Sequence, residues 1–221
     1  MAADVHELDR FRRQFDDVLS QRVRPNLRAH GFRKAGRIFR RERGPLYDMI
    51  GFQADKWNGV TQHFGAFVNV GVGSADMDAV HLDHPRTDGV PVREYVLERR
   101  WERLNPALPG ELMLDDATDL EQFADVLTAG LDTVVESMSA LDSTTELTQW
   151  AVSNNRLQRM EKTCRYLASV ADVQTLSRYA RSLRDEFGNE PRWPAFAQVI
   201  LEASGSVADR LVADGSVDTS A

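Results

Sequence analysis

The sequence has little of what holds small secreted domains together or anchors a chain in a membrane. Its 221 residues include one cysteine, Cys164, so no disulfide can form within the chain. No apolar run approaches the roughly 18–20 residues that a membrane-spanning helix needs. The first residues, up to Phe15, mix acids with arginines, whereas a secretion signal is basic and then apolar. We therefore expect a cytoplasmic protein that does not bind a membrane.

Lysine is scarce as well, with three lysines beside 24 arginines, and the formal net charge is −7. A chain of this charge is not generally attracted to DNA. The charge is uneven, because residues 1–60 carry 13 basic and 8 acidic side chains, whereas residues 111–150 carry ten acids and no basic residue. Hydrophobic residues at 42% and charged residues at 28% are typical of globular proteins, which excludes a wholly disordered, collagen-like or coiled-coil chain.

The first half of the sequence predicts a helix followed by strands. In residues 5–27 apolar positions recur every three or four residues, which indicates an amphipathic helix, and Pro25 should disturb it near Val23. Three segments then alternate or run apolar with short connections, which favours an antiparallel meander. These segments are 37–43, 46–54 and 62–72, followed by an expected surface loop at 73–91. Residues 92–104 fit an edge strand or a short helix, of which we favour the strand, and 111–114 fit one more short strand.

The second half reads as helical. Thr118 with Glu121, and Ser143 with Glu146, have the spacing of a helix-capping box. Cys164 lies on an apolar helical stripe, so we expect it to be a buried small hydrophobe.

The predicted fold class is therefore α+β, since strands are followed by helices rather than alternating with them. We expect an antiparallel meander of three to five strands packed on an N-terminal helix, followed by a mainly helical C-terminal half. The predicted domains are an α+β domain at 1–142, a helical extension at 143–213 and a disordered tail at 214–221.

A family pattern spans residues 31–71. Its positions are Gly31 and Phe32, Phe39 and Arg41, Ile50, Phe52 and Gln53, Trp57, and Phe67, Asn69 and Gly71. This pattern resembles the uncharacterised bacterial family known as domain of unknown function 4304, over roughly residues 8–140. The resemblance supports the fold and implies no activity.

Alternation along the strands predicts a polar face on the meander, opposite a core face with Ile38, Ile50, Phe52, Val68, Val70 and Val72. Such a face suits a polar ligand or a partner's backbone, because it offers a charged group, side-chain amides that both donate and accept hydrogen bonds, and little steric bulk. The candidate binding residues are Arg41, Gln53 and Asn69, with Phe39, Tyr47 and Trp57. The alternative is that these residues bond to one another and fix the strand register.

A basic band is the strongest charge feature. It contains Arg33, Lys34, Arg37, Arg40 and Arg43, together with Arg24, Arg28 and Arg41. Such a band can follow a phosphate backbone. The ten acids of 111–150 offer an internal counterweight, or a surface for a basic protein.

We predict no metal site, because His81 and His84 lie in the expected loop without regular spacing, and no cofactor. The leading hypothesis is a non-enzymatic binding module for a protein partner, in a toxin-neutralising or regulatory role, through the polar sheet face or the acidic helices. One alternative is a nucleic-acid-binding protein that uses the band from Arg24 to Arg43. Another is an enzyme whose site combines Arg41, Gln53 and Asn69. The sequence leaves the oligomeric state open.

Overall fold

The computed structural model describes residues 5–60, 62–81 and 93–218, with side chains from residue 9 onward. The chain divides into two compact units. The sheet unit runs to Val72 and then from Leu97 to Asp142, and the helical unit contains Gly73 to Val96 and the residues from Ser143 onward.

The N-terminal helix is continuous but changes its winding before Pro25. It consists of α1 (Val5–Val18), a π-helical turn η1 (Leu19–Val23) and α2 (Arg24–Ala29). Proline lacks the N–H that an α-helical turn needs, and the wider turn is closed by the N–H of Arg24 donating to the carbonyl of Leu19. The disturbance predicted near Val23 is confirmed. The helix ends at Ala29, and Gly31, whose φ is 85°, takes the left-handed position that follows it.

The sheet is antiparallel in each pairing that the register describes. Its strands are β1 (Arg33–Ala35), β2 (Ile38–Arg43), β3 (Leu46–Ala54), β4 (Phe64–Ser74), β5 (Leu97–Arg100) and β6 (Leu112–Leu114). The order is β1-β2-β3-β4-β5, and β6 also pairs with β4. The predicted fold class, an antiparallel sheet with an N-terminal helix and a mainly helical C-terminal half, is confirmed.

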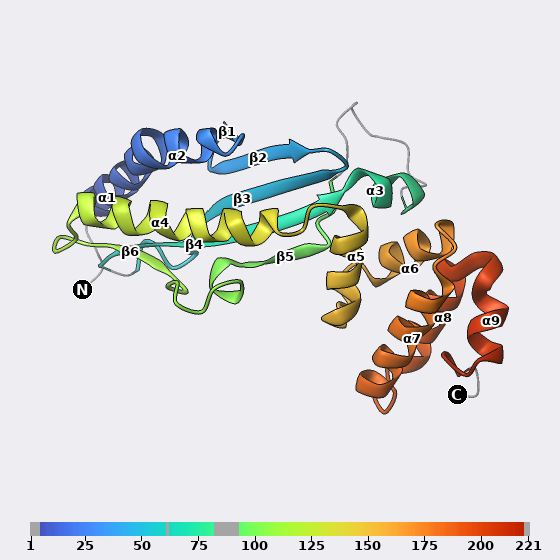
Figure 1. Ribbon diagram of the computed structural model, residues 1–221. Helices are drawn as coiled ribbons and strands as arrows, with labels where there is room; N and C mark the ends of the chain where they lie inside the picture. Colours follow the sequence, from blue (N-terminus) through green and yellow to red (C-terminus); the bar gives the residue numbers. More distant parts are fainter. Residues whose placement is uncertain (1–4, 61, 82–92, 219–221) are drawn as a thin grey trace, which may run out of the picture. The chain divides into compact units, whose positions relative to one another are not determined.

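One face of the sheet carries the core of this unit, beneath α1, α2 and α4 (Leu120–Ser139) (Figure 1). The ring of Phe15 on α1 lies 6.0 Å from Phe52 and 5.2 Å from Phe64, and Phe123 on α4 approaches it at 6.5 Å. The N-cap of α4 is Asp119, whose side chain accepts hydrogen bonds from the N–H groups of Glu121 and Gln122. The sequence had placed this cap at Thr118.

The helical unit contains one helix that the sequence did not predict, α3 (Ala75–His81), within the expected loop 73–91. The hydroxyl of Ser74 accepts from the N–H groups of Asp76 and Met77 and so begins this helix. The remaining helices are α5 (Thr144–Ser153), α6 (Met160–Ser169), α7 (Val173–Phe187), α8 (Trp193–Ser204) and α9 (Ala208–Ala213). Short 3₁₀ turns, η3 (Trp101–Arg103) in the sheet unit and η4 (Gly205–Val207) here, complete the secondary structure.

Two expectations for the helical unit are confirmed and one differs. Ser143 caps α5 by accepting from the N–H of Glu146, and Cys164 is completely buried in the core with Leu176. Of the tail expected to be disordered at 214–221, residues 214–218 are described and bury Val217 to 1% exposure, and residues 219–221 lie outside the described ranges. No helix in the described ranges has the length and apolar character needed to cross a membrane.

Candidate functional site

The strand register separates the predicted site residues onto two faces. Phe39 pairs with Ile50, and Arg41 pairs with Asp48. Residues directly opposite each other share a face, so Phe39 and Arg41 belong to the helix-covered face with Ile50. Gln53 accepts a hydrogen bond from Asn69 at 3.2 Å on the other face. The prediction that Arg41, Gln53 and Asn69 share one face is therefore wrong.

The same register corrects the predicted core face in one position. The buried side is confirmed for Ile50, Phe52, Val68, Val70 and Val72. Ile38 pairs with Gly51 and is half-buried on the opposite side. Phe39 is 1% exposed, so it is a core residue rather than a ligand-binding one.

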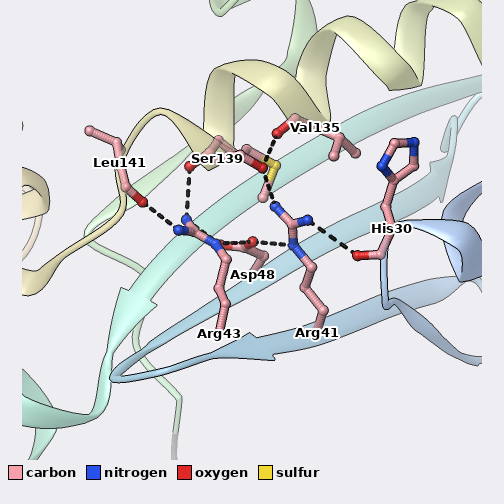
Figure 2. Close-up of polar contacts among 8 residues, drawn as sticks. His30, Arg41, Arg43, Asp48, Val135, Ser139 and Leu141 are labelled. Atoms are coloured by element: carbon pink, nitrogen blue, oxygen red, sulfur yellow. Dashed lines mark hydrogen bonds and ion pairs between the residues drawn. The ribbon is translucent and has the colours of Figure 1, made fainter.

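Arg41 and Arg43 converge on one buried carboxylate, that of Asp48 (Figure 2). Arg43 donates from Nε to Oδ2 at 2.7 Å and from Nη2 to Oδ1 at 3.2 Å, while Arg41 donates from Nε to Oδ2 at 2.6 Å. The side chain of Asp48 has no exposed surface. We call these three residues the Asp48 cluster.

The arginines of the Asp48 cluster also bind the end of α4 (Figure 2). Arg43 donates to the carbonyls of Met138, at 2.8 Å, and Leu141, and Arg41 donates to the hydroxyl of Ser139 at 2.7 Å. The last carbonyls of a helix have no partners within it and carry partial negative charge, which cations stabilise. The cluster therefore fastens the β2–β3 hairpin to α4, and both arginines are occupied within the fold.

The rest of the basic band is also divided between the faces. Arg37 forms a two-pronged ion pair with Asp16 at 2.7 and 2.9 Å, and Lys34 donates to the hydroxyl of Ser20. Arg33 and Arg40 lie opposite each other on the uncovered side of the sheet. Neither forms an ion pair or side-chain hydrogen bond with any residue that the structure describes.

The acidic segment is paired chiefly with α1 and α2 rather than with the strands. Arg22 pairs with Glu121 and Asp125 on α4, and the hydrogen bond and charge of Glu121 raise the pKa of its guanidinium. Asp132 accepts from the amide of Asn26 at 2.9 Å and contacts His30 at 3.1 Å. Arg10 pairs with Asp116. The sequence offered these acids as a counterweight to the basic band, but none of the partners described here is an arginine of that band, whose ion pairs are with Asp16 and Asp48.

The side of the sheet opposite α1, α2 and α4 is here called the open face. Gln53 is exposed on it, while Phe67 and Asn69 are half-buried. The guanidinium of Arg100 lies 4.1 Å from the centre of the Phe67 ring. The open face comprises Ile38, Arg40, Met49, Gly51, Gln53, Phe67, Asn69, Arg100 and Met113, with Arg33 on the edge strand. Tyr47 belongs to the same side by alternation but is 5% exposed.

Large apolar side chains are exposed at the end of the sheet where β3 leads to β4. Trp57, Val60 and Met113 are 57%, 66% and 55% exposed, and we call them the apolar end. The side chain of Asn58 both donates to and accepts from the backbone of Gly65 at 2.7 Å, which ties the connection to β4. Met113 lies directly opposite Gly65 on β6. Sequence reasoning identified Trp57 but missed Val60 and Met113, because no local pattern marks their exposure.

A second charged cluster, in the helical unit, was also missed. Lys162 on α6 has a fully buried side chain that pairs with Asp78 on α3 and donates to the carbonyl of Glu94 at 3.0 Å. Burial lowers the pKa of Lys162, against the opposing effect of Asp78. Glu94 also pairs with Arg159 at 3.1 Å and with His81 at 3.4 Å.

Of the two histidines considered as metal ligands, His84 lies outside the described residues. Within the described ranges, no group of three or more histidine, cysteine or acidic side chains could hold a metal ion.

These observations define an α+β protein whose antiparallel sheet is covered on one face by helices of its own unit, while no helix described in that unit covers the open face. A family model described as domain of unknown function (DUF4304) matches residues 23–141, which is more than half of the chain. The chain belongs to this family. The match spans both the Asp48 cluster and the open face. Comparisons with curated proteins and with solved structures returned no match.

Proposed function

We propose that the protein is a non-enzymatic, cytoplasmic binding module that engages a protein partner through the open face and the apolar end. The observation that carries this proposal is the exposure of Trp57 and Val60 in the β3–β4 connection and of Met113 on β6, each more than half accessible. Exposed apolar side chains that gather on a surface mark interaction sites, and tryptophan and methionine are enriched in them. Such a surface is what a toxin-neutralising or regulatory role requires.

The neighbouring groups on the open face support the same proposal. Met49 and Phe67 are half-buried on the same face as the exposed amide of Gln53, and Arg100 covers one side of the Phe67 ring. Protein interfaces combine such an apolar centre with polar groups at the rim. The acids of α4 are less suited to docking, because Glu121 and Asp125 already pair with Arg22 on η1, and Asp132 accepts from Asn26 on α2.

The other two hypotheses lose part of their basis. An enzyme site that combines Arg41 with Gln53 and Asn69 would have to reach through the sheet, since Arg41 lies on the helix-covered face. Nucleic-acid binding by the whole basic band would require Arg37, Arg41 and Arg43 to leave their carboxylates. We therefore treat nucleic acid as an outcome of the test.

The test is a tagged pull-down from the protein's own cells at low salt, with and without nuclease. The double variant Trp57→Ser/Met113→Ser removes two side chains of the apolar end. The control is Val126→Ser, because Val126 is 56% exposed on α4, the helix that covers the other face.

We expect a stoichiometric protein that survives nuclease and remains with Val126→Ser, but is lost with the double variant. Retention of the partner by the double variant would remove the apolar end from the interface. Recovery of nucleic acid, or of proteins released by nuclease, would contradict the protein-binding proposal.

A further inference from the structure

Two arginines face each other at one end of the open face. Arg33 on β1 is directly opposite Arg40 on β2, so their side chains leave the sheet on the same side. The alternate pair, Lys34 and Phe39, points to the helix-covered face, where Lys34 donates to Ser20 at 2.8 Å and Phe39 is buried. The register therefore places the two arginine side chains next to each other, on the side of the sheet opposite α1 and α2.

Neither Arg33 nor Arg40 forms an ion pair with a residue that the structure describes. The other cross-strand neighbour of Arg40 is Met49. Like charges directly opposite each other destabilise a sheet. By contrast, Arg37, Arg41 and Arg43 each bind a carboxylate.

We propose that Arg33 and Arg40 form a carboxylate-binding site that recognises an acidic segment of the protein partner. This inference rests on the proposed function, since it places a charged contact at the β1–β2 end of the open face. Guanidinium groups bind carboxylates through two parallel hydrogen bonds. β1 is the edge strand, so a partner can reach Arg33 from the face and from the edge.

The occupant that fits is a carboxylate-bearing peptide rather than a nucleic-acid strand. Tracking a phosphate backbone takes many basic contacts, and six to ten are usual for a specific DNA-binding protein. Here two neighbouring arginines lie at this end of the open face, which is fewer basic contacts than tracking a phosphate backbone takes. Two guanidinium groups match one or two acidic side chains of a peptide that also contacts the apolar residues beside them.

The experiment measures fluorescence anisotropy with labelled hexaglutamate as the probe, and with labelled oligothymidine as the competing class of ligand. The test variant is Arg33→Gln/Arg40→Gln. The matched control is Arg12→Gln/Arg24→Gln, which removes the same charge at two exposed arginines without described partners. Circular dichroism establishes that each variant is folded.

We expect the wild-type protein to bind hexaglutamate and the test variant to lose about tenfold in affinity, as charged hydrogen bonds are removed. The control should change affinity by less than about twofold, because salt screens distant charges. An equal loss of affinity in the test and control variants would show that hexaglutamate responds to net charge and not to a site at Arg33 and Arg40. Tighter binding of oligothymidine with the same arginine dependence would assign the site to nucleic acid, and absence of hexaglutamate binding would remove the site.

These outcomes are separate from failure of the proposed function. If hexaglutamate does not bind while the Trp57→Ser/Met113→Ser variant still loses its protein partner, the binding module stands without this contact. If that variant keeps its partner, the module's proposed surface is wrong whatever the arginines bind.

Discussion

Arg43 donates hydrogen bonds to both carboxylate oxygens of Asp48, and this carboxylate is completely buried. Removing one partner from a buried ion pair leaves an uncompensated charge, which costs more than the pair contributes. Here Arg41 binds the same carboxylate, so one acid holds two arginines. Asp48 is thereby central to the attachment of the β2–β3 hairpin to α4.

The first prediction concerns Asp48→Asn. The amide keeps the shape but removes the charge that both arginines need, so the free energy of unfolding should fall by about 3 kcal/mol. Urea denaturation followed by circular dichroism measures this change. Asp17→Asn is the control, because Asp17 is exposed on α1 and has no described partner. Equal stability of the two variants would show that the cluster adds nothing to the fold.

The Asp48 cluster also shows where sequence reasoning ends. Alternation predicted β3 at its observed limits and placed Ile50 and Phe52 on the core side. It could not predict which face of β2 meets them, because this depends on how the Gly44–Pro45 hairpin sets the register. The turn pairs Arg43 with Leu46, and Arg41 consequently joins the core face instead of Gln53 and Asn69.

Other features were hidden for similar reasons. Apolar periodicity does not reveal α3, which begins with a hydroxyl cap at Ser74 in a segment rich in turn-forming residues. The exposure of Met113 follows from its place opposite Gly65, which is a tertiary property. Arg33 and Arg40 were recognised as basic, but only the pairing of β1 with β2 shows that they are neighbours.

The second prediction is a pH effect at Lys162. Its pKa in the folded protein is below the ordinary value of 10.5, chiefly because of burial. Between the lowered pKa and 10.5 the unfolded chain binds more protons than the folded one, so stability from this group rises with pH. The measurement is the urea midpoint of unfolding of the wild type and of Lys162→Met at several pH values. Across that alkaline window the midpoint of the wild type should rise relative to that of the variant.

Below the lowered pKa, Lys162 is protonated in both states and the difference between the two proteins should be constant. If the urea midpoints of the two proteins change in parallel with pH throughout the alkaline range, the assignment of this titration to Lys162 is wrong. Lys56→Met is the matched control, because Lys56 is exposed and lies 5.0 Å from the Trp57 ring.

The third prediction concerns the reactivity of Cys164. Its side chain is completely buried, and burial raises the pKa of the thiol to about 12. The thiolate is the reactive form, so the folded protein should resist Ellman's reagent at neutral pH. One equivalent should react after unfolding in urea, because the chain contains a single cysteine. Rapid labelling of the folded protein would show that α6 opens readily.

The last prediction concerns the C-terminal segment, which Asp214 holds in place. Its carboxylate accepts from the N–H of Ser216 and the hydroxyl of Ser177, each at 2.9 Å, and pairs with Arg181 at 3.3 Å. The hydrogen bond from the Ser216 side chain is the largest cause that lowers the pKa of Asp214. Val217, three residues further on, is buried in the helical core.

A carboxyl with a lowered folded pKa stabilises the native state above its ordinary value of 3.8, and this contribution is lost as the pH falls through the lowered value. Asp214→Ala should therefore lower the melting temperature at neutral pH by about 2–4 °C and speed amide exchange at residues 214–218. The exposed Asp209→Ala is the control. If amide exchange at residues 214–218 is equally fast in both variants, burial of Val217 rather than the Asp214 carboxylate holds the segment. The loss of stability at low pH should then be absent as well.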